Sequence, residues 1–346
     1  MRHVVIIRPG GYDRLVIEDA PDLVPTPGHV IVDVEAAGVN YADCIVRMGL
    51  YKSARTLMGY PMTPGFEFAG RVAGAGDNVR RFAVGQHVYG VTLFNGYATQ
   101  VSVPEHQLFT LPAELTVLEA ATFPVAFLTA WYAALKLGQA ASGMTALVHA
   151  AAGGVGSALT QILTAAGCDV VGVVGSSEKI SVAKNMGCRE VIDKSAEPLW
   201  SKAEQYSARG YDLIFDSVGV ATLGQGYRHL APMGKLVTYG FSSMLPRAGH
   251  RVNVFALAMN FLKTPRFNPI HMADDNRSVL GFNLSFLFEH KEILEEGMRY
   301  VLHLLQEHKL RPLPVVEYPA EDVSRAHRDL ESGRTTGKLA LRMRAA

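Results

Sequence analysis

The feature that most constrains this chain is a glycine-rich turn that joins a short apolar strand to a helix. The predicted strand TALVHA runs into AAGGVG at 151–156 and then into the apolar segment SALTQILTAAG. A dinucleotide-binding turn needs small residues at three places: for the tight turn, for the approach of backbone N–H groups to the pyrophosphate, and for helix–strand packing. Ala151, Gly153 and Gly156 hold these places, with alanine instead of the usual first glycine. The turn therefore predicts a dinucleotide site contacted by Ala152, Gly153, Gly154, Val155 and Gly156.

The segments on both sides of this turn alternate short buried strands with helices. The helical segment FLTAWYAALKLG precedes the turn, and DVVGVVG, EKISVAKNMG, EVID, YDLIFDSVG, a helix near 221–230 and KLVTYG follow it. Strands that alternate with helices of about a dozen residues are typical of a parallel, doubly wound sheet. We therefore expect an α/β protein with a Rossmann-type nucleotide-binding domain over residues 125–289.

The remaining residues have a different pattern and predict a second domain. Short β-rich runs broken by glycine and proline fill 1–124, among them HVIVDVEAAGV, FEFAGRVAGAG, QHVYGVTLF and YATQVSV. Several alternate apolar and polar residues, as half-buried strands do. After an amphipathic helix near 289–308 the tail predicts strand, helix, strand, and we expect 290–346 to fold back onto 1–124. The length of 346 residues agrees, because a single core stops growing at about 250–300 residues.

Charge and cysteine content argue against several classes of function. The formal net charge is +1, with lysines and arginines spread along the chain, so there is no basic patch for nucleic acid or an anionic membrane. The three cysteines are too few and too scattered for a disulfide framework or a cysteine-rich zinc lobe. The N-terminal residues lack a signal-peptide pattern, and VNVFALAMNFLKTP is shorter than a membrane span and predicts a core or interface helix. We expect a soluble protein of the reducing cytoplasm.

The end of the strand after the glycine turn predicts which nucleotide is bound. An NAD-binding protein usually has an acidic residue about twenty residues past the glycines, where it binds the ribose 2′-hydroxyl. Here DVVGVVG is followed by Ser176, Ser177, Glu178 and Lys179. Hydroxyl groups and an ammonium suit a 2′-phosphate, and a glutamate in a first helical turn usually faces solvent. Ser176 and Lys179 therefore favour NADPH, with a solvated helix residue as the alternative for Lys179.

Several motifs together resemble those of a known family. HAAAGGVG, GVNYADCIVRMGLY, PGFEFAG, DSVG and GKLVTYG resemble the zinc-independent quinone oxidoreductases of the medium-chain dehydrogenase/reductase superfamily. NRSVLGFNLSFL and GKLAL look more like its VAT-1-like branch than like the shorter bacterial quinone reductases. The resemblance covers essentially the whole chain. It implies a GroES-like catalytic domain built from both chain ends, a Rossmann domain, and a homodimer joined through the Rossmann sheets. It also implies cofactor contacts from Thr129, Gly240, Ser242 and Lys194, the last in place of the family's tyrosine.

The same resemblance bears on zinc. Zinc alcohol dehydrogenases of this superfamily use a cysteine and a histidine at positions that look like Asn40 and Phe66 here, and neither an amide nor a phenyl ring replaces those ligands. Glu67, next in sequence, is expected to remain as a structural hydrogen-bonding acid. Without a Lewis acid the acceptor must already be electrophilic, which favours quinones and conjugated enones.

Within GVNYADCIVRMGLY, the resemblance places Asn40, Asp43, Arg47 and Tyr51 near the nicotinamide and the acceptor. Asp43 and Arg47 stand four apart, so in a helix they would form an ion pair, which could also do no more than pin that helix. Asn40 can hydrogen-bond a carboxamide or a quinone oxygen. Tyr51 offers a ring and a hydroxyl, either as a proton donor or only as a wall of the pocket. His149, at the end of a buried strand, is expected to be a packed, hydrogen-bonded core residue.

Three functions remain open from the sequence. The first is hydride transfer from NADPH to a quinone, in which the protein orients the reactants and excludes water. The second is an NADPH-dependent enone or alkenal reductase that uses the same site. The third is a non-enzymatic NADPH-binding adaptor, because VAT-1-like relatives are associated with vesicles. The glycine turn and the Asn40–Tyr51 motif are both intact, whereas an adaptor would need only the turn.

Overall fold

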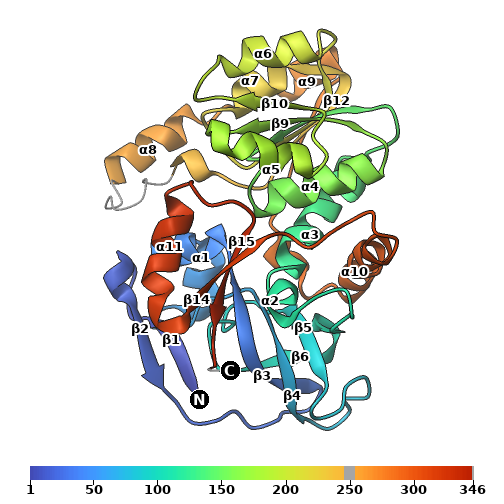
Figure 1. Ribbon diagram of the computed structural model, residues 1–346. Helices are drawn as coiled ribbons and strands as arrows, with labels where there is room; N and C mark the ends of the chain where they lie inside the picture. The colour runs from blue at the N-terminus through green and yellow to red at the C-terminus, as the bar shows by residue number, and fades with distance from the viewer. Residues whose placement is uncertain (245–253, 345–346) are drawn as a thin grey trace.

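The computed structural model describes residues 1–244 and 254–344, and Figure 1 shows them as two stacked domains. The upper domain holds a sheet with helices on both sides, and the lower domain is mostly β-structure. Both ends of the chain lie in the lower domain (Figure 1). The predicted α/β class, with a GroES-like sheet and a Rossmann sheet, is confirmed. The residue ranges given above for the two domains remain predictions.

The upper sheet has six parallel strands in the order β10-β9-β8-β11-β12-β13. Its strands are β8 (Thr145–His149), β9 (Asp169–Val174), β10 (Glu190–Asp193), β11 (Tyr211–Asp216), β12 (Leu230–Thr238) and β13 (Ser278–Gly281). The chain starts at β8 and winds outward first in one direction and then in the other, so the order reverses between β8 and β11. Ligands of doubly wound sheets bind at the carboxyl ends of the strands beside this reversal.

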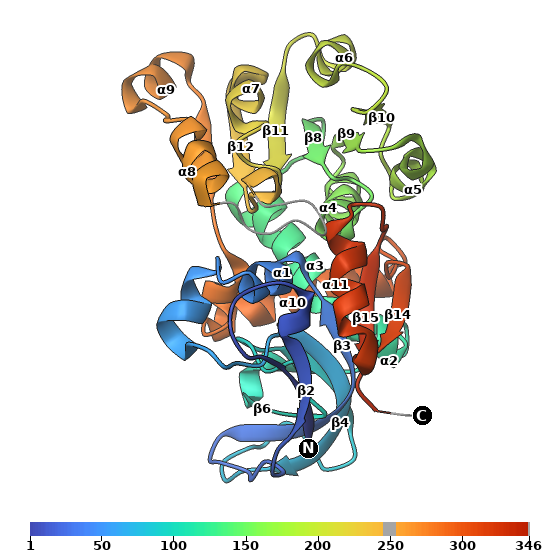
Figure 2. The same cartoon turned by 90° about the vertical axis from the view of Figure 1, so that its left-hand side faces the viewer.

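Helices cover both faces of this sheet. In Figure 2, α6 and α7 lie above the sheet and α4 lies below it. The helices of this part of the chain are α3 (Pro124–Trp131), α4 (Gly154–Ala165), α5 (Ile180–Asn185), α6 (Leu199–Tyr206), α7 (Leu223–Arg228), α8 (Val254–Lys263) and α9 (Pro269–Asp275). A π-helical turn, η4 (Tyr132–Leu137), continues α3, and a 3-10 turn, η5 (Ser177–Lys179), precedes α5.

The lower sheet runs in the order β14-β15-β3-β4-β5-β7, and β6 also pairs with β3. Its strands are β3 (His29–Val39), β4 (Glu67–Ala75), β5 (His87–Val91), β6 (Gln100–Pro104), β7 (Leu108–Thr110), β14 (Val315–Pro319) and β15 (Lys338–Arg342), and β1 (Arg2–Ile6) forms a separate hairpin with β2 (Leu15–Asp19). Because β15 pairs antiparallel with β3, the tail folds back onto the N-terminal part, as predicted. The helices here are α1 (Tyr41–Arg47), α2 (Val117–Ala120), α10 (Lys291–Gln306) and α11 (Val323–Glu331).

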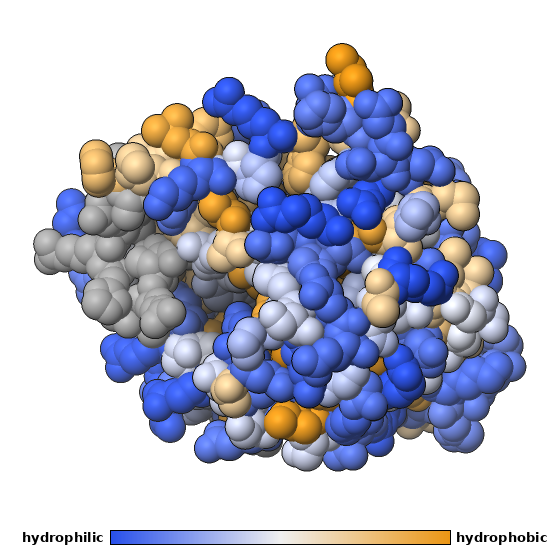
Figure 3. Space-filling view, turned by 90° about the horizontal axis from the view of Figure 1, so that it is seen from above, coloured by the Kyte–Doolittle hydropathy of each residue, from blue (hydrophilic) through white to orange (hydrophobic). Residues whose placement is uncertain are grey.

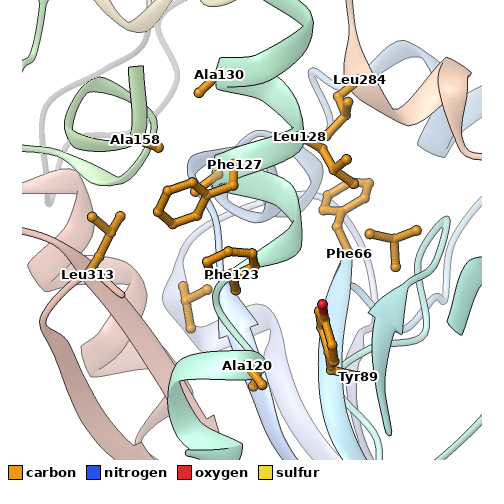
Figure 4. Close-up of a cluster of buried hydrophobic side chains, with 14 of the residues drawn as sticks. Phe66, Tyr89, Ala120, Phe123, Phe127, Leu128, Ala130, Ala158, Leu284 and Leu313 are labelled. Atoms are coloured by element: carbon orange, nitrogen blue, oxygen red, sulfur yellow. The ribbon is translucent and has the colours of Figure 1, made fainter. Parts of the chain in front are cut away.

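One apolar core runs through the junction of the two domains. Phe123 and Phe127 stack with ring centroids 4.2 Å apart at the start of α3. Figure 4 shows them between Ala158 and Leu313 on one side and Phe66 on the other. These five side chains belong to one buried cluster. The two domains therefore share packing at α3, and this fixes the position of the site that lies between them.

The surface of the upper domain carries apolar side chains only in limited areas. Seen from above it is mostly hydrophilic, with small separate apolar patches (Figure 3). Four large apolar side chains on α8 are exposed: Phe255, Met259, Phe261 and Leu262. The prediction that this segment is a core helix is therefore wrong, and the alternative that it lies in an interface stays a prediction. Val252 and Asn253 of the same segment lie outside the described residues. None of the helices in the described residues is long and apolar enough to cross a membrane.

Candidate active site

The glycine turn lies where the sequence predicts it, between the end of β8 and the start of α4. Ala150 adopts a φ of 53°, and Gly153 donates its N–H to the Ala150 carbonyl at 2.9 Å. A Cβ added at Gly156 would lie 2.2 Å from the Ala150 carbonyl oxygen, so only glycine fits there. Gly153 and Gly154 are half-buried, and α4 begins at Gly154. The first N–H groups and the positive end of the dipole of a helix that begins at such a turn suit a pyrophosphate.

The residues proposed for the 2′-phosphate lie at the ends of β9 and β10. Ser176 precedes η5, and the Lys194 Cε lies 3.9 Å from the position of a Cβ added at Gly175. Lys194 is exposed and takes part in none of the ion pairs among the described residues. The side chain of Lys179 is directed at the lower domain instead, where its ammonium donates to the carbonyls of Gly333 and Thr335. Burial, and secondarily Lys194, lower the pKa of Lys179.

The other three predicted cofactor contacts lie near the same edge of the upper sheet. Gly240 and Ser242 follow β12, and both pack against Ser217 at the end of β11, where Ser242 donates its N–H to the Ser217 carbonyl. Thr129 is buried in α3, and its hydroxyl donates to the Val125 carbonyl at 2.6 Å. Gly240 and Ser242 thus lie beside the end of β11, whereas the hydroxyl of Thr129 bonds within α3.

Asn40 lies at the junction between β3 and α1, and both the nitrogen and the oxygen of its side-chain amide are hydrogen-bonded. Its Nδ2 donates to Glu67 Oε1 at 2.8 Å, and its Oδ1 accepts from the Lys338 ammonium at 2.6 Å. An amide nitrogen carries two N–H groups, so one Nδ2–H remains for another partner. Lys338 is a site residue that sequence reasoning missed, although it belongs to the GKLAL motif.

Glu67 and Lys338 form a buried ion pair beside Asn40. Lys338 Nζ lies 2.8 Å from Glu67 Oε1, and the side chains are 6% and 0% exposed. The second Glu67 oxygen accepts from the Val125 N–H at 2.8 Å, at the start of α3. The predicted structural role of Glu67 as a hydrogen-bonding acid is confirmed by these bonds. Buried charges persist only when they are paired and hydrogen-bonded, as these are.

The residues at the positions of the superfamily's zinc ligands do not fit a metal ion. The Phe66 ring packs against the rings of Tyr51 and Phe94, with centroids 5.6 Å and 5.3 Å away. Next to Asn40 and Glu67 the Lys338 ammonium already supplies a positive charge, which would repel a cation. A tetrahedral zinc site needs thiolate, imidazole or carboxylate ligands that are free to bind it.

Asp43 and Arg47 both lie in α1, but the ion pair predicted between them is wrong. The Asp43 carboxylate instead accepts from the N–H groups of Asn40 and Gly65 and from the Tyr97 hydroxyl, at 2.8–3.0 Å. Arg47 pairs with Glu331 of α11 at 2.8 Å. Arg47 thus pairs with another segment, and Asp43 bonds both to the N-cap of its own helix and to Gly65 and Tyr97. Burial raises the pKa of Asp43 to about 7, against these three hydrogen bonds.

A buried polar cluster lies beneath α1. Cys44, His327 and Glu331 offer three potential metal-ligand atoms within 4.8 Å of one another. The Arg47 guanidinium lies among them, 3.4 Å from His327 Nδ1 and 2.8 Å from Glu331. A metal ion there would meet this positive charge, so the cluster joins α1 to α11 without one. Burial, and secondarily Arg47, lower the pKa of His327 to about 3.

Tyr51 joins the two domains across the site. Its hydroxyl donates to Asn283 Oδ1 at 3.0 Å and lies 2.9 Å from Ser285 Oγ, just after β13. Burial raises its pKa. A tyrosine with two hydroxyl partners and aromatic neighbours fits the role of a pocket wall better than that of a proton donor.

His149 is packed as predicted, but it is not hydrogen-bonded. It is 1% exposed, and neither ring nitrogen has a hydrogen-bond partner among the described residues. Its Nε2 lies 3.9 Å from Asp216 Oδ2, whose carboxylate is already held by the N–H groups of Val218 and Gly219. Burial lowers the pKa of His149.

Comparison with known proteins extends over nearly the whole chain. Residues 26–113 match the alcohol dehydrogenase GroES-like domain, and residues 186–341 match a zinc-binding dehydrogenase family. The rat synaptic vesicle membrane protein VAT-1 homolog is 32% identical over 99% of this chain and 84% of its own length. Human quinone oxidoreductase is 27% identical over 99% of this chain and 97% of its own. The Escherichia coli quinone oxidoreductase complexed with NADPH has a TM-score of 0.86 at 25% identity, covering 99% of each chain.

Proposed function

The chain belongs to the family of quinone oxidoreductases and VAT-1 homologues within the medium-chain dehydrogenase/reductases, and on this premise we propose that it transfers hydride from NADPH to quinones without zinc. One observation carries this proposal. The glycine turn and the Asn40 amide meet at Lys338, whose stem lies against Gly154 and whose ammonium holds Asn40. A cofactor bound along the turn would therefore place its reactive end beside Asn40.

The choice of NADPH rests on the groups at the ends of β9 and β10. Ser176 offers a hydroxyl to a 2′-phosphate, and the exposed Lys194 offers an ammonium that has no ion-pair partner within 1–244 and 254–344. Lys179 can join them if it releases its two carbonyl partners. A charged hydrogen bond to a phosphate is worth about 1.5–3 kcal/mol. The Escherichia coli relative is described as a complex with NADPH, which supports the same choice. Bound NADPH would supply the hydride.

The residues around Asn40 then act by position and charge. The remaining Nδ2–H of Asn40 is available to an acceptor oxygen or to the nicotinamide carboxamide. A donor fixed before reaction stabilises the negative charge that develops on a quinone oxygen. With an ammonium in place of a metal, no Lewis acid activates a simple ketone, so an acceptor that is already electrophilic is favoured.

The test is NADPH oxidation by the purified protein against a panel of ortho-quinones, para-quinones and alkenals. We expect quinones to have the highest kcat/KM. Higher kcat/KM for alkenals would favour the second candidate, an NADPH-dependent enone or alkenal reductase, which the same site would serve. NADPH binding without turnover of any acceptor would overturn the enzymatic proposal and favour a non-enzymatic, VAT-1-like adaptor. The match to the rat vesicle protein is the reason to test for this outcome.

The proposal also includes the bounds of the two domains. We propose that residues 1–124 and 290–346 form the catalytic domain and that residues 125–289 form the nucleotide-binding domain.

We also propose a homodimer joined through the upper sheet, since β13 lies at its edge and pairs only with β12 among the described strands. Light scattering after size exclusion would test the dimer. A cytoplasmic location is proposed with it, and fractionation of cells that produce the protein would test that location.

A further inference from the structure

Lys338 contacts both the glycine turn, at Gly154, and the other end of the proposed site, at Asn40. We call these two parts the phosphate turn and the acceptor end. The residue before it, Gly337, donates its N–H to the Ala152 carbonyl at 3.1 Å and forms a β-bridge with Gly153. Gly337 has a φ of +63°, and a Cβ there would lie 2.2 Å from the Pro314 carbonyl oxygen. The backbone that carries Lys338 is therefore fixed against the turn.

The side chain of Lys338 spans the distance from the turn to Asn40. A Cβ added at Gly154 would lie 2.8 Å from Lys338 Cδ, so the aliphatic stem lies directly over the start of α4. The ammonium reaches Asn40 Oδ1, Glu67 Oε1 and, at 3.4 Å, the Val39 carbonyl. Its three N–H groups are thus all directed at protein acceptors, which suits a role in holding neighbours rather than in donating a proton.

The ammonium also decides which way the Asn40 amide points. With Oδ1 against Lys338 and Nδ2 against Glu67, one N–H stays available for a reactant. In a flipped amide, Nδ2 would face the N–H groups of the ammonium and Oδ1 would face a carboxylate oxygen, so two hydrogen bonds would be replaced by two repulsions. Without the ammonium this constraint disappears, and Glu67 would be left as an unpaired buried charge.

We propose that Lys338 is a positioning residue that links the seating of the cofactor phosphates on the glycine turn to the orientation of the Asn40 amide. A phosphate that shifts the turn moves the Lys338 stem over Gly154, and the ammonium passes this shift to Asn40. This inference rests on the proposed NADPH-dependent activity and deepens it. Nothing is transferred to or from Lys338 in the reaction.

The kinetic test uses Lys338→Met, which keeps the stem and removes the charge. If that variant does not fold, Lys338→Met combined with Glu67→Gln leaves no uncompensated buried charge. We expect kcat for a quinone to fall about 10- to 100-fold, the loss typical of a misplaced reacting group, with little change in NADPH affinity. In an Asn40→Ala background the same change should have almost no further effect, because Lys338 acts through Asn40. Lys338→Arg should restore part of kcat.

Lys309→Met is the matched control, since Lys309 is an exposed lysine paired with Glu307 at 2.8 Å, and it should leave kcat and KM unchanged. Losses that add fully in the Asn40→Ala background would overturn the proposal. A loss confined to NADPH affinity would overturn it as well, because Lys338 would then be a phosphate ligand only.

A second measurement does not depend on turnover. In protein labelled with ¹⁵N-asparagine, the Asn40 side-chain signal is identified by its disappearance in Asn40→Ala. Addition of 2′-phosphoadenosine diphosphate ribose, which has the pyrophosphate and the 2′-phosphate of NADPH but no nicotinamide, should shift this signal in the wild type and not in Lys338→Met. No shift in the wild type would overturn the coupling. An inactive wild type that still shows the shift would reject the proposed function while supporting this inference.

Discussion

The two ends of the site are built in opposite ways. The phosphate turn consists of consecutive residues, 150–156, and in the proposed site it would bind through backbone N–H groups and the absence of side chains. The acceptor end consists of charged and polar side chains from distant segments, since Lys338 bonds to Asn40 and Glu67 across 298 and 271 positions of sequence. The turn should therefore be sensitive to added volume, and the acceptor end to changed charge.

The largest effect is expected from added volume at the turn. In Gly156→Ala the new methyl group would meet the Ala150 carbonyl oxygen at 2.2 Å, a backbone atom that cannot rotate away. We expect a loss of stability near the upper end of the usual 1–3 kcal/mol for overpacking, together with loss of NADPH binding, because the turn itself must move. Gly153→Ala is the matched control for stability, since its nearest neighbour would be 3.3 Å away. Thermal unfolding measures stability and calorimetry measures binding, and an equal loss of stability in the two variants would contradict this view of the turn.

The next effect is expected from added charge at the acceptor end. Asn40→Asp keeps the volume but places a carboxylate against Glu67, where the Asn40 amide now donates at 2.8 Å. It also sets negative charge near an acceptor that gains negative charge. We expect Asn40→Ala to lower kcat by about 100-fold and Asn40→Asp to lower it further, with NADPH affinity little changed in Asn40→Ala. Steady-state rates at saturating NADPH decide this, and an Asp variant as active as the Ala variant would show that Asn40 does not face the developing charge.

A smaller effect separates the two lysines beside the turn. Lys194 is exposed and has no ion-pair partner in the part of the chain that the structure describes, whereas Lys179 already donates to Gly333 and Thr335. We expect Lys194→Ala to weaken NADPH binding by about 1.5–3 kcal/mol and to leave NADH binding nearly unchanged. Lys179→Ala should weaken NADPH binding less, and it should also reduce thermal stability because it releases the loop at 333–335. Equal losses for NADPH and NADH in Lys194→Ala would mean that Lys194 does not bind the 2′-phosphate.

The smallest effect is expected from the buried polar cluster of Cys44, Arg47, His327 and Glu331, which lies outside both ends of the site. Burial lowers the pKa of His327 from 6.5 to about 3, so the unfolded chain takes up a proton first as pH falls. The stability that neutral His327 contributes is present above pH 6.5 and is lost as pH falls toward 3. His327→Gln should therefore gain roughly 1 kcal/mol over the wild type for each pH unit below 6.5. The raised pKa of Asp43 acts in the opposite direction but cancels between the two proteins. Identical pH profiles of unfolding would contradict this expectation.

The difference between a turn made of consecutive residues and an acceptor end made of distant residues explains how much of the site could be predicted from the sequence. The turn at 151–156 can be predicted because strand, glycines and helix are neighbours in sequence and each has a local physical cause. Lys338 belongs to the GKLAL motif, but its partners lie far away in the sequence, so its bonds to Asn40 and Glu67 could not be predicted from the motif alone. Arg47 misleads for the same reason. Its spacing from Asp43 suggests a helical ion pair, but a more distant residue, Glu331, holds it instead.

The fold follows the local patterns more closely than the site does. Alternating strands and helices predict β8 to β12 as strands of one parallel sheet, without their order in it, and the tail returns to β3 as its strand pattern suggests. The α8 helix shows the limit of predictions from local patterns. An apolar face predicts that a helix is buried, but it does not indicate which part of the molecule covers it. Phe255 and Phe261 remain 75% and 72% exposed.

In the site that we propose, a lysine ammonium rather than a metal ion occupies the acceptor end. The most direct test measures zinc by mass spectrometry and NADPH–quinone turnover on the same protein sample, before and after treatment with a strong chelator. We predict far less than one zinc per chain and the same turnover before and after treatment, because Lys338 already pairs with Glu67 and holds Asn40. Stoichiometric zinc, with turnover lost on chelation and restored by added zinc, would contradict the claim.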